Sequence, residues 1–453
     1  MIAALTRGMT LTQRAARSSA ITVAGFGGAQ AIRLASNLIL ARLLFPEAFG
    51  IMAMVSVFLM GLAMFSDVGT GPAIMQSRRG DDPDFLDTAW TIQILRGLML
   101  YAAALVLTRP MAQWYGEPDL ATYLPVAALT LVIAGFNPTR AETANRHMRA
   151  GRLTMIELAT QGVGVVVAVA LALWLQSVWA LVLSGIVSML VHVWFLDRFL
   201  PGARNRLAWE RPAARELVSF GKWVFLSTIC GFAIGQADKL ILGAWLATSD
   251  FGIYNIGFFL ASFPLMLGGV VTRRVLIPIY RESPPAASPA NFAHLRRMRV
   301  AATGALFGLA AILAFTGPWL IDVLYDPRYA AASGIVVLIA VTQLPALVVM
   351  TYDQAALAAG DSRNYFVLAA ARAGLVIAGL LAGLALGGLP GALAGQGLAQ
   401  VAAYPVVVWL ARRQGAWDRT HDMCYGGLAT AIAVSAIWLH WPRIAILSQM
   451  ISG

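Results

Sequence analysis

The stretch from Leu44 to Met52 reads LFPEAFGIM, and a similar stretch, LATSDFGIY, runs from Leu246 to Tyr254, 202 residues later. Both contain Phe-Gly-Ile with an acidic residue shortly before it. In each half of the chain a long helix with polar residues leads into this turn, and an apolar helix follows it. The repeat predicts two related bundles of about six helices with the same orientation, related by an axis along the membrane normal.

The residues around these two turns are mostly apolar. The 453 residues are 59% hydrophobic and only 12% charged, which excludes a soluble protein and leaves no sizeable soluble domain. Apolar runs of about 20 residues predict an all-α polytopic membrane protein with about 12 to 14 transmembrane helices in two repeat-related six-helix bundles around a central cavity. The spans are expected near 20–44, 48–66, 89–107, 120–137, 153–174, 178–196, 218–246, 251–271, 300–317, 331–350, 365–387, 391–410 and 424–440.

The cations indicate how the chain crosses the membrane. Of the 33 lysines and arginines, 24 fall in the N-terminal tail and in alternate loops, and the intervening loops contain only Arg109, Arg328 and Arg443. This asymmetry predicts a multi-pass protein of the bacterial inner membrane with a cytoplasmic N-terminus. It explains the net charge of +11 by orientation and by contact with anionic membrane lipids, with no nucleic-acid partner.

Loop composition predicts the domain limits. We expect an N-terminal transmembrane bundle over 1–197, a basic cytoplasmic linker over 198–216, a C-terminal transmembrane bundle over 217–411, and one or more additional helices over 412–453. The glycine spacings Gly304 to Gly308 and Gly391 to Gly395 predict close helix packing.

Polar residues inside the spans are the candidate functional residues, because a charge there costs on the order of 2.5 to 3.5 kcal/mol to insert. The helical spacing places three of them on one face of the first span, and two more form an i, i+3 pair in its repeat-related counterpart. Two further arginines lie seven or eight residues inside their spans, where snorkelling to the interface is the alternative. The predicted substrate-binding residues are Arg33, Lys239, Arg96, Arg372, Gln30, Asn37 and Gln236. For Arg33 and Lys239, the alternative to lining a cavity is a structural salt bridge or an inter-helix hydrogen bond.

Two acidic residues are candidates for ion coupling. Asp238 lies deepest, next to Lys239 in sequence but pointing elsewhere on the helix, and it could pair with an arginine or take up a proton. Asp353 lies near the inner end of its span. The five histidines show no ligand spacing with one another or with cysteine, so no metal site is predicted.

Four stretches carry a family resemblance. They are Ala41 to Gln76, Phe136 to Trp179, Gly221 to Asn255, and the pair Leu324-Tyr-Asp-Pro-Arg-Tyr329 and Gly360-Asp-Ser-Arg363. They resemble the polysaccharide transporter family, the oligosaccharide flippases of the multidrug/oligosaccharidyl-lipid/polysaccharide exporter superfamily.

The resemblance implies two bundles around a cavity that opens alternately to the cytoplasm and the periplasm. It also implies a flippase for undecaprenyl-diphosphate-linked oligosaccharide repeat units in exopolysaccharide, capsule or O-antigen synthesis, with no catalytic residue and no bound cofactor. A proton or sodium gradient is the candidate energy source, and a polysaccharide polymerase and export machinery are candidate partners. Arginine and lysine suit this substrate because they bind phosphate oxygens.

Two other function classes stay open. A drug or small-molecule exporter of the same superfamily would be expected to bind cations with acidic residues, so the balance of Arg33 and Lys239 against Asp238 discriminates it. A polysaccharide polymerase or ligase would need reactive groups outside the membrane, and the longest loops on that side, around Thr108 to Asp119 and Pro318 to Ala331, contain only about a dozen residues.

Overall fold

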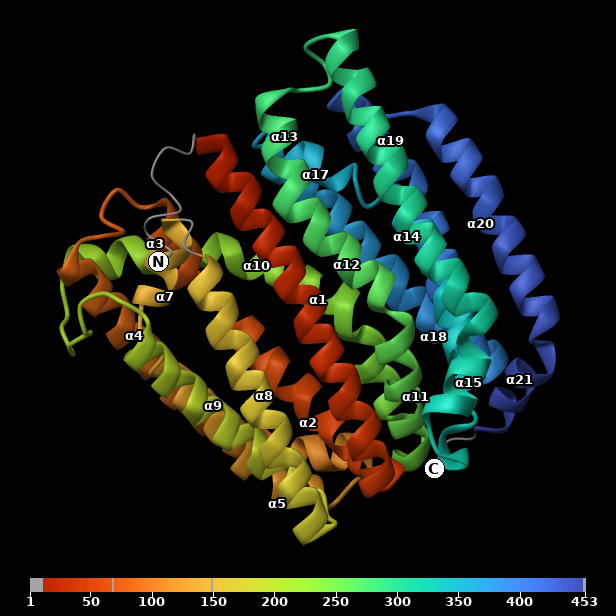
Figure 1. Ribbon diagram of the computed structural model, residues 1–453, viewed down its shortest axis with the longest axis horizontal. Helices are drawn as coiled ribbons and strands as arrows, with labels where there is room; N and C mark the ends of the chain where they lie inside the picture. The colour runs from red at the N-terminus through yellow and green to blue at the C-terminus, as the bar shows by residue number, and fades with distance from the viewer. Residues whose placement is uncertain (1–10, 67–68, 148–149, 451–453) are drawn as a thin grey trace. The chain divides into compact units, whose positions relative to one another are not determined.

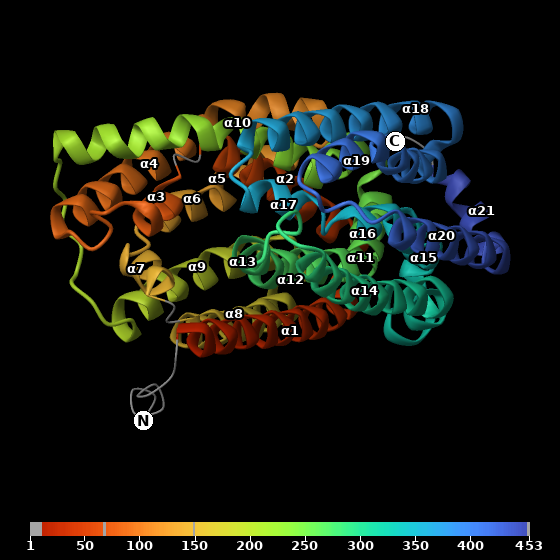
Figure 2. The ribbon, with the colours of Figure 1, turned by 90° about the horizontal axis from the view of Figure 1, so that it is seen from above.

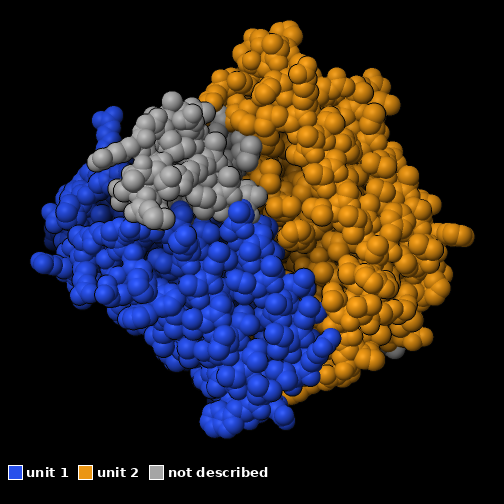
Figure 3. Space-filling view, viewed as in Figure 1, with its two compact units in different colours: residues 1–44, 54–229 blue, residues 45–53, 230–453 orange. Residues whose placement is uncertain are grey.

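The computed structural model describes residues 11–66, 69–147 and 150–450, and for residues 11–23, 150, 220–227, 274, 275, 278 and 362 it describes the backbone alone. The regular structure of the described residues is helical throughout, which confirms the predicted all-α class. The chain divides into two compact units (Figure 3): unit 1 is Met1–Leu44 with Met54–Ile229, and unit 2 is Phe45–Ala53 with Cys230–Gly453.

Unit 1 contains the first nine helices except the beginning of the second, together with the first part of the tenth (Figure 1). Their bounds are α1 (Leu11–Leu43), α2 (Pro46–Phe65), α3 (Thr70–Gln76), α4 (Pro83–Tyr115), α5 (Leu120–Ala127), α6 (Leu129–Gly135), α7 (Arg140–Arg146), α8 (Ala150–Leu175), α9 (Trp179–Phe199) and α10 (Arg211–Gly243).

Unit 2 contains the beginning of α2, the end of α10 and all later elements. These are α11 (Thr248–Ala261), α12 (Phe263–Val271), the π-helix η2 (Thr272–Leu276), α13 (Ile277–Glu282), α14 (Pro289–Leu324), η3 (Pro327–Tyr329), α15 (Ala332–Thr342), α16 (Leu344–Val349), α17 (Asp353–Ala358), α18 (Ser362–Ala402), α19 (Tyr404–Arg413), α20 (Arg419–Leu439), α21 (Trp441–Ala445) and η4 (Ile446–Gln449).

Many of these helices are apolar enough to cross a membrane. Among the described residues there are 8 such helices, or up to 10 if each of two bent helix pairs counts as one span. Every predicted span falls on a helix or on consecutive helices. The spans 20–44 and 218–246 lie on α1 and α10, whose side chains are described only in part, and the 51-residue stretch Arg363–Arg413 holds two predicted spans. The count of about 12 to 14 stays a prediction.

In unit 1, α1 lies directly along α8 (Figures 1 and 2). A side chain at Gly25 would meet the Thr154 methyl at 2.1 Å, so the absence of a Cβ lets the two helices approach closely. Further along the same pair, the Gln161 side-chain amide donates to the Ala29 carbonyl at 3.1 Å.

The segment before α10 is fixed to α4 by alternate backbone groups. The N–H groups of Arg206, Ala208 and Glu210 donate to side-chain oxygens of Asp87, Thr91 and Thr88, each at 3.1 Å. In an extended chain every second residue faces the same side, so alternate backbone N–H groups can bond to one neighbouring helix. This part of the predicted 198–216 linker therefore packs on unit 1, while the predicted domain limits themselves stay a prediction.

In unit 2 the two copies of the repeated turn pack on each other reciprocally. A Cβ on Gly50 would meet the Thr248 carbonyl oxygen at 2.0 Å, and a Cβ on Gly252 would meet the Pro46 carbonyl oxygen at 1.9 Å. Pro46 and Gly50 lie 202 residues before Thr248 and Gly252, the offset of the sequence repeat. The equivalent glycine in each copy is thus the point of closest approach to the other copy.

The helix α18 is a hairpin of two arms, and it turns at two glycines. Gly388 has φ 59°, a left-handed conformation that favours glycine, and Gly387 before it is also non-helical. A Cβ on Gly383 would meet the Gly391 carbonyl oxygen at 2.0 Å, and one on Gly379 would meet the Gly395 carbonyl oxygen at 2.4 Å. Close packing at Gly391 and Gly395 is confirmed. In the other predicted pair, a Cβ on Gly304 would meet the Tyr425 hydroxyl at 2.9 Å, but a Cβ on Gly308 would meet nothing within 4 Å, so the prediction is wrong for Gly308.

Candidate functional site

The end of α10 holds a cation within unit 2. The Lys239 ammonium donates to Gln236 Oε1 at 3.2 Å and lies 3.9 Å from the centre of the Phe258 ring on α11. The predicted i, i+3 pair is therefore in contact, and the aromatic face adds a cation–π attraction of about 0.5 to 2 kcal/mol. Among the described residues, no carboxylate forms an ion pair with Lys239, whose recorded contacts are an amide and an aromatic ring.

Asp238 lies on a different side of the same helix. Its carboxylate accepts a hydrogen bond from the Tyr254 hydroxyl of α11, and both residues are buried. Lys239 and Asp238 therefore belong to separate contacts, as expected for neighbours on a helix. The role of Asp238 in ion coupling stays a prediction.

The candidates on α1 in unit 1 differ in exposure although they share one face by sequence. Gln30 is buried, Asn37 is half-buried and Arg33 is exposed. Arg33 therefore projects from the surface of unit 1, and its charge is accessible to a ligand or to lipid headgroups.

The third predicted cation, Arg96, is bonded to the end of α2 in unit 1. Its Nε donates to Ser66 Oγ at 2.9 Å, and its guanidinium donates to the Ala63 carbonyl. The last carbonyl groups of a helix lack intrahelical donors, so Arg96 supplies one and ties α4 to α2.

Arg372 and Asp353 were predicted separately, as a substrate-binding cation and an ion-coupling acid, and the structure joins them in one ion pair. Arg372 on α18 donates to Asp353 at the start of α17, and the two side chains are 13% and 15% exposed. Burial raises the pKa of the Asp353 carboxyl above its ordinary value, although the Arg372 guanidinium acts to lower it. Asp353 Oδ1 and Arg372 Nε are buried with no hydrogen-bond partner among the described atoms.

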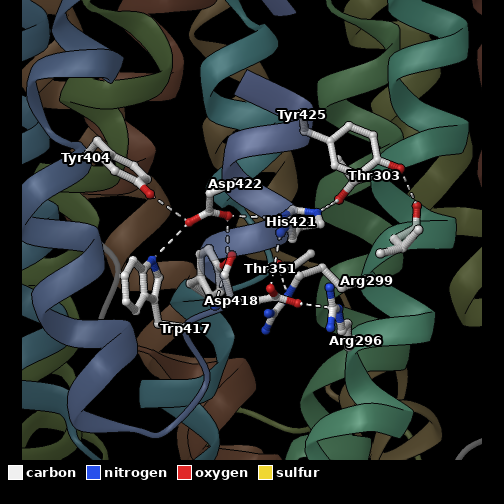
Figure 4. Close-up of polar contacts among 12 residues, drawn as sticks. Arg296, Arg299, Thr303, Thr351, Tyr404, Trp417, Asp418, His421, Asp422 and Tyr425 are labelled. Atoms are coloured by element: carbon white, nitrogen blue, oxygen red, sulfur yellow. Dashed lines mark hydrogen bonds and ion pairs between the residues drawn. The ribbon is translucent and has the colours of Figure 1, made fainter. Parts of the chain in front are cut away.

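An extensive polar network of unit 2 was not predicted from the sequence (Figure 4). We call it the anchor cluster, because it joins α20 to α14, α19 and the turn between α16 and α17. It consists of Arg296, Arg299, Thr303, Thr351, Tyr352, Tyr404, Trp417, Asp418, His421, Asp422 and Tyr425.

Asp422 is the centre of the anchor cluster. Its two oxygens accept from the hydroxyl of Tyr352 at 2.7 Å, the hydroxyl of Tyr404 at 2.9 Å and the indole N–H of Trp417 at 3.1 Å. His421 adds a fourth contact, from Nδ1 to Oδ1 at 3.0 Å. A buried carboxylate with this many donors is stably placed.

Two arginines of α14 also belong to the anchor cluster. Arg299 is 2% exposed, donates to Thr351 Oγ1 at 3.1 Å and stacks 4.2 Å from the centre of the Tyr352 ring. Arg296 forms an ion pair with Asp418 at 2.9 Å, and Asp418 in turn caps α20 by accepting from the His421 N–H at 3.1 Å.

One part of the anchor cluster, the start of α20, is indicated by the sequence. Asp418 followed by Arg-Thr-His-Asp and then an apolar run is an N-cap pattern, which predicts a helix start at Arg419. The partners on α14 and before α17 are distant in sequence, so a single sequence gives no pairing for them.

The class of protein follows from the fold and from comparison with known families. The chain belongs to the family described as polysaccharide biosynthesis protein, whose model matches residues 39–334. This confirms the resemblance to the polysaccharide transporter family and shows a multi-pass membrane protein.

Two named relatives are similar to about half of the chain. The succinoglycan biosynthesis transport protein ExoT of Rhizobium meliloti (strain 1021) is 26% identical over 247 residues, 54% of this chain and 49% of the relative. The lipopolysaccharide biosynthesis protein WzxC of Escherichia coli (strain K12) is 24% identical over 254 residues, 54% of this chain and 50% of the relative. The chain thus spans about half the length of the curated relatives it matches.

Solved transporters share the fold. A MOP superfamily transporter from Pyrococcus furiosus, described as having a binding pocket of reversed polarity, aligns with a TM-score of 0.60 at 17% identity, covering 89% of this chain and 96% of its own. An inward-facing multidrug resistance MATE family transporter of that superfamily aligns with a TM-score of 0.59 at 15% identity, covering 85% and 94%. At this identity the similarity describes the fold alone.

Proposed function

We propose that this protein is a flippase that moves undecaprenyl-diphosphate-linked oligosaccharide repeat units from the cytoplasmic to the periplasmic leaflet of the bacterial inner membrane. The N-terminus is cytoplasmic, and the two bundles expose the binding site to each side in turn. Family membership, a relative named as a succinoglycan transport protein and the transporter fold support this proposal. Polymerase and export machinery are the proposed partners.

The observation that carries the proposal is the state of Lys239. A diphosphate entering a region of low dielectric constant needs a cation that is not already neutralised. Arg372 is neutralised by Asp353, whereas Lys239 is held by an amide and an aromatic ring. One of the three ammonium donors goes to Gln236, which leaves donors for phosphate oxygens.

The rival transport function is export of small cationic compounds. Such an exporter is expected to bind its cargo with an acid, and the acid beside Lys239 in sequence is engaged with Tyr254. Because Asp238 is buried and Lys239 is half-buried, the more accessible charge at the end of α10 is that of Lys239, which favours an anionic ligand. For the energy source, a proton or sodium gradient is proposed, with Asp238 and Asp353 as candidate coupling acids.

The test is accumulation of lipid-linked oligosaccharide in cells that lack the protein. Wild type is expected to restore polysaccharide, whereas Lys239→Met, which keeps length and removes charge, is expected to lower it at least tenfold at matched membrane expression, a loss of about 1.4 kcal/mol or more of binding. Lys239→Arg is expected to keep much of the activity.

Arg109→Ala is the matched control, because Arg109 is an exposed cation in unit 1 on the predicted periplasmic side. It is expected to behave as wild type. Full activity of Lys239→Met would contradict the cationic site, and unpolymerised oligosaccharide accumulating in the periplasm of the deletion strain would replace the flippase by a polymerase or ligase.

A further inference from the structure

His421 has a polar partner at each ring nitrogen, although its side chain is 0% exposed. Nδ1 lies 3.0 Å from Asp422 Oδ1, and Nε2 lies 3.1 Å from Thr303 Oγ1. Asp422 also accepts from two hydroxyl groups and an indole, so its oxygens act as acceptors and Nδ1 carries the proton of this contact.

Thr303, the partner of Nε2, differs chemically from Asp422, the partner of Nδ1. A threonine hydroxyl can donate to a bare nitrogen or accept from a protonated one, and it changes between the two by rotation of a hydrogen alone. His421 can therefore bind a proton at Nε2 and release it while every heavy atom of the contact stays in place.

Charged groups of both signs surround His421. Arg296 is paired with Asp418 on one side, and Arg299 lies against Tyr352, whose hydroxyl donates to Asp422. Within the cluster two cations and two anions balance when the histidine is neutral, and a proton on Nε2 adds one positive charge. Arg412 is a further cation beside the cluster, 4.0 Å from the centre of the Trp417 ring. The titratable tyrosines around these groups are Tyr280, Tyr352, Tyr404 and Tyr425.

The neighbours of His421 connect it to several elements. Thr303 lies on α14, Tyr404 on α19 and Tyr352 in the turn before α17, and each is bonded directly to His421 or Asp422. A charge on the imidazole therefore acts on the contacts that hold α20 in unit 2.

We propose that His421 is a reversible proton-binding site of unit 2, with Asp422 fixing its Nδ1 proton and Thr303 serving as the switchable partner of Nε2. A use of this proton in transport would rest on the proposed flippase function; the site itself does not.

The test is nitrogen NMR of the imidazole groups in the full-length protein, reconstituted in nanodiscs and labelled at histidine, between pH 5 and 9. His421→Gln assigns the resonance among the five histidines. We expect Nδ1 to stay protonated throughout and Nε2 to gain a proton on acidification. A constant protonation state over this range, or an unprotonated Nδ1, would overturn the proposal.

Thr303→Val tests the switchable partner, because valine can neither donate nor accept. It leaves the charged Nε2–H unsatisfied, so the midpoint of the His421 titration is expected to fall by about one pH unit or more. Thr316→Val is the control on the same helix, where an exposed threonine bonds only its own helix through the Ile312 carbonyl. Equal midpoints in the two variants would remove Thr303 from the proposal.

The NMR measurement tests the proton-binding site independently of the proposed flippase function. The NMR experiment follows protonation and involves no lipid-linked sugar, so a non-titrating His421 in a protein that flips its substrate overturns the proton site alone. A titrating His421 in a protein that does not flip the substrate overturns the flippase and leaves the proton site standing.

Discussion

Replacing Gly383 by alanine is expected to destabilise unit 2, whereas the same change at Gly374 on the same helix is expected to be neutral or slightly stabilising. At Gly383 the new methyl would lie 2.0 Å from the Gly391 carbonyl oxygen, a backbone atom that cannot turn away. At Gly374 nothing lies within 4 Å. Forcing the two arms of α18 apart should cost about 1 to 3 kcal/mol.

The informative result is the direction of the stability change in each of the two variants. Alanine favours an exposed helix over glycine by about 0.5 to 1 kcal/mol, so propensity alone predicts that both variants are more stable. Thermal unfolding of the purified variants in one detergent measures the difference directly. If Gly383→Ala is as stable as Gly374→Ala, the arms of α18 do not pack as described.

The glycine spacing explains why this hairpin forms. Gly379, Gly383, Gly387, Gly391 and Gly395 recur every four residues. Because residues four apart share a face of a helix, the chain presents a glycine face on both arms once it turns at Gly387 and Gly388. The two faces then approach to backbone contact.

The second large effect is expected at the buried ion pair. Arg372→Leu leaves the Asp353 carboxyl buried without its cation, and breaking such a pair typically costs about 3 to 5 kcal/mol. Arg372→Leu combined with Asp353→Asn removes both charges and should recover most of the lost stability. Arg363→Leu, an exposed arginine on the same helix, should change stability by less than about 0.5 kcal/mol.

The loss of folding stability caused by Arg372→Leu should depend on pH. The pKa of Asp353 is already raised in the folded protein by burial, and removing Arg372 raises it further. The unfolded chain titrates near pH 3.9, so the folded state holds a proton that the unfolded state releases as the pH rises above that value. The destabilisation should therefore be small near pH 4 and grow toward neutral pH, and the double variant should show no such dependence.

A double variant as unstable as Arg372→Leu would contradict a structural ion pair. A double variant that folds like wild type but no longer restores polysaccharide would show that the pair also serves transport. Both results come from the same set of proteins, measured for unfolding and for complementation.

The sequence predicted those parts of the molecule that depend on local spacing. Apolar runs placed the helices, the repeated Phe-Gly-Ile turns marked equivalent positions, and the i, i+3 rule paired Gln236 with Lys239. The apolar runs and the i, i+3 pair depend on residues within a few turns of one helix, and the repeat depends on a short motif that recurs in the chain. That the two copies meet at Gly50 and Gly252 was not predicted and comes from the structure.

The parts that sequence could not supply are contacts between distant segments. Arg372 and Asp353 are 19 residues apart, and His421 and Thr303 are 118 residues apart. Charge inside a span signals a partner or a cavity, but it does not say which. Arg299 is one of the 24 cations that the sequence places on the cytoplasmic side, in a basic segment, yet it is buried in the anchor cluster.

The most direct measurement uses purified protein in liposomes that contain undecaprenyl-diphosphate-linked oligosaccharide in both leaflets and a membrane-impermeant glycosidase outside. The flippase account predicts that wild-type protein makes the inner-leaflet sugar accessible, so that digestion proceeds beyond the outer-leaflet fraction reached in protein-free liposomes, and that Lys239→Met does not. Digestion that stops at the outer-leaflet fraction, with folded wild-type protein in the membrane and a proton or sodium gradient imposed across it, would contradict the account.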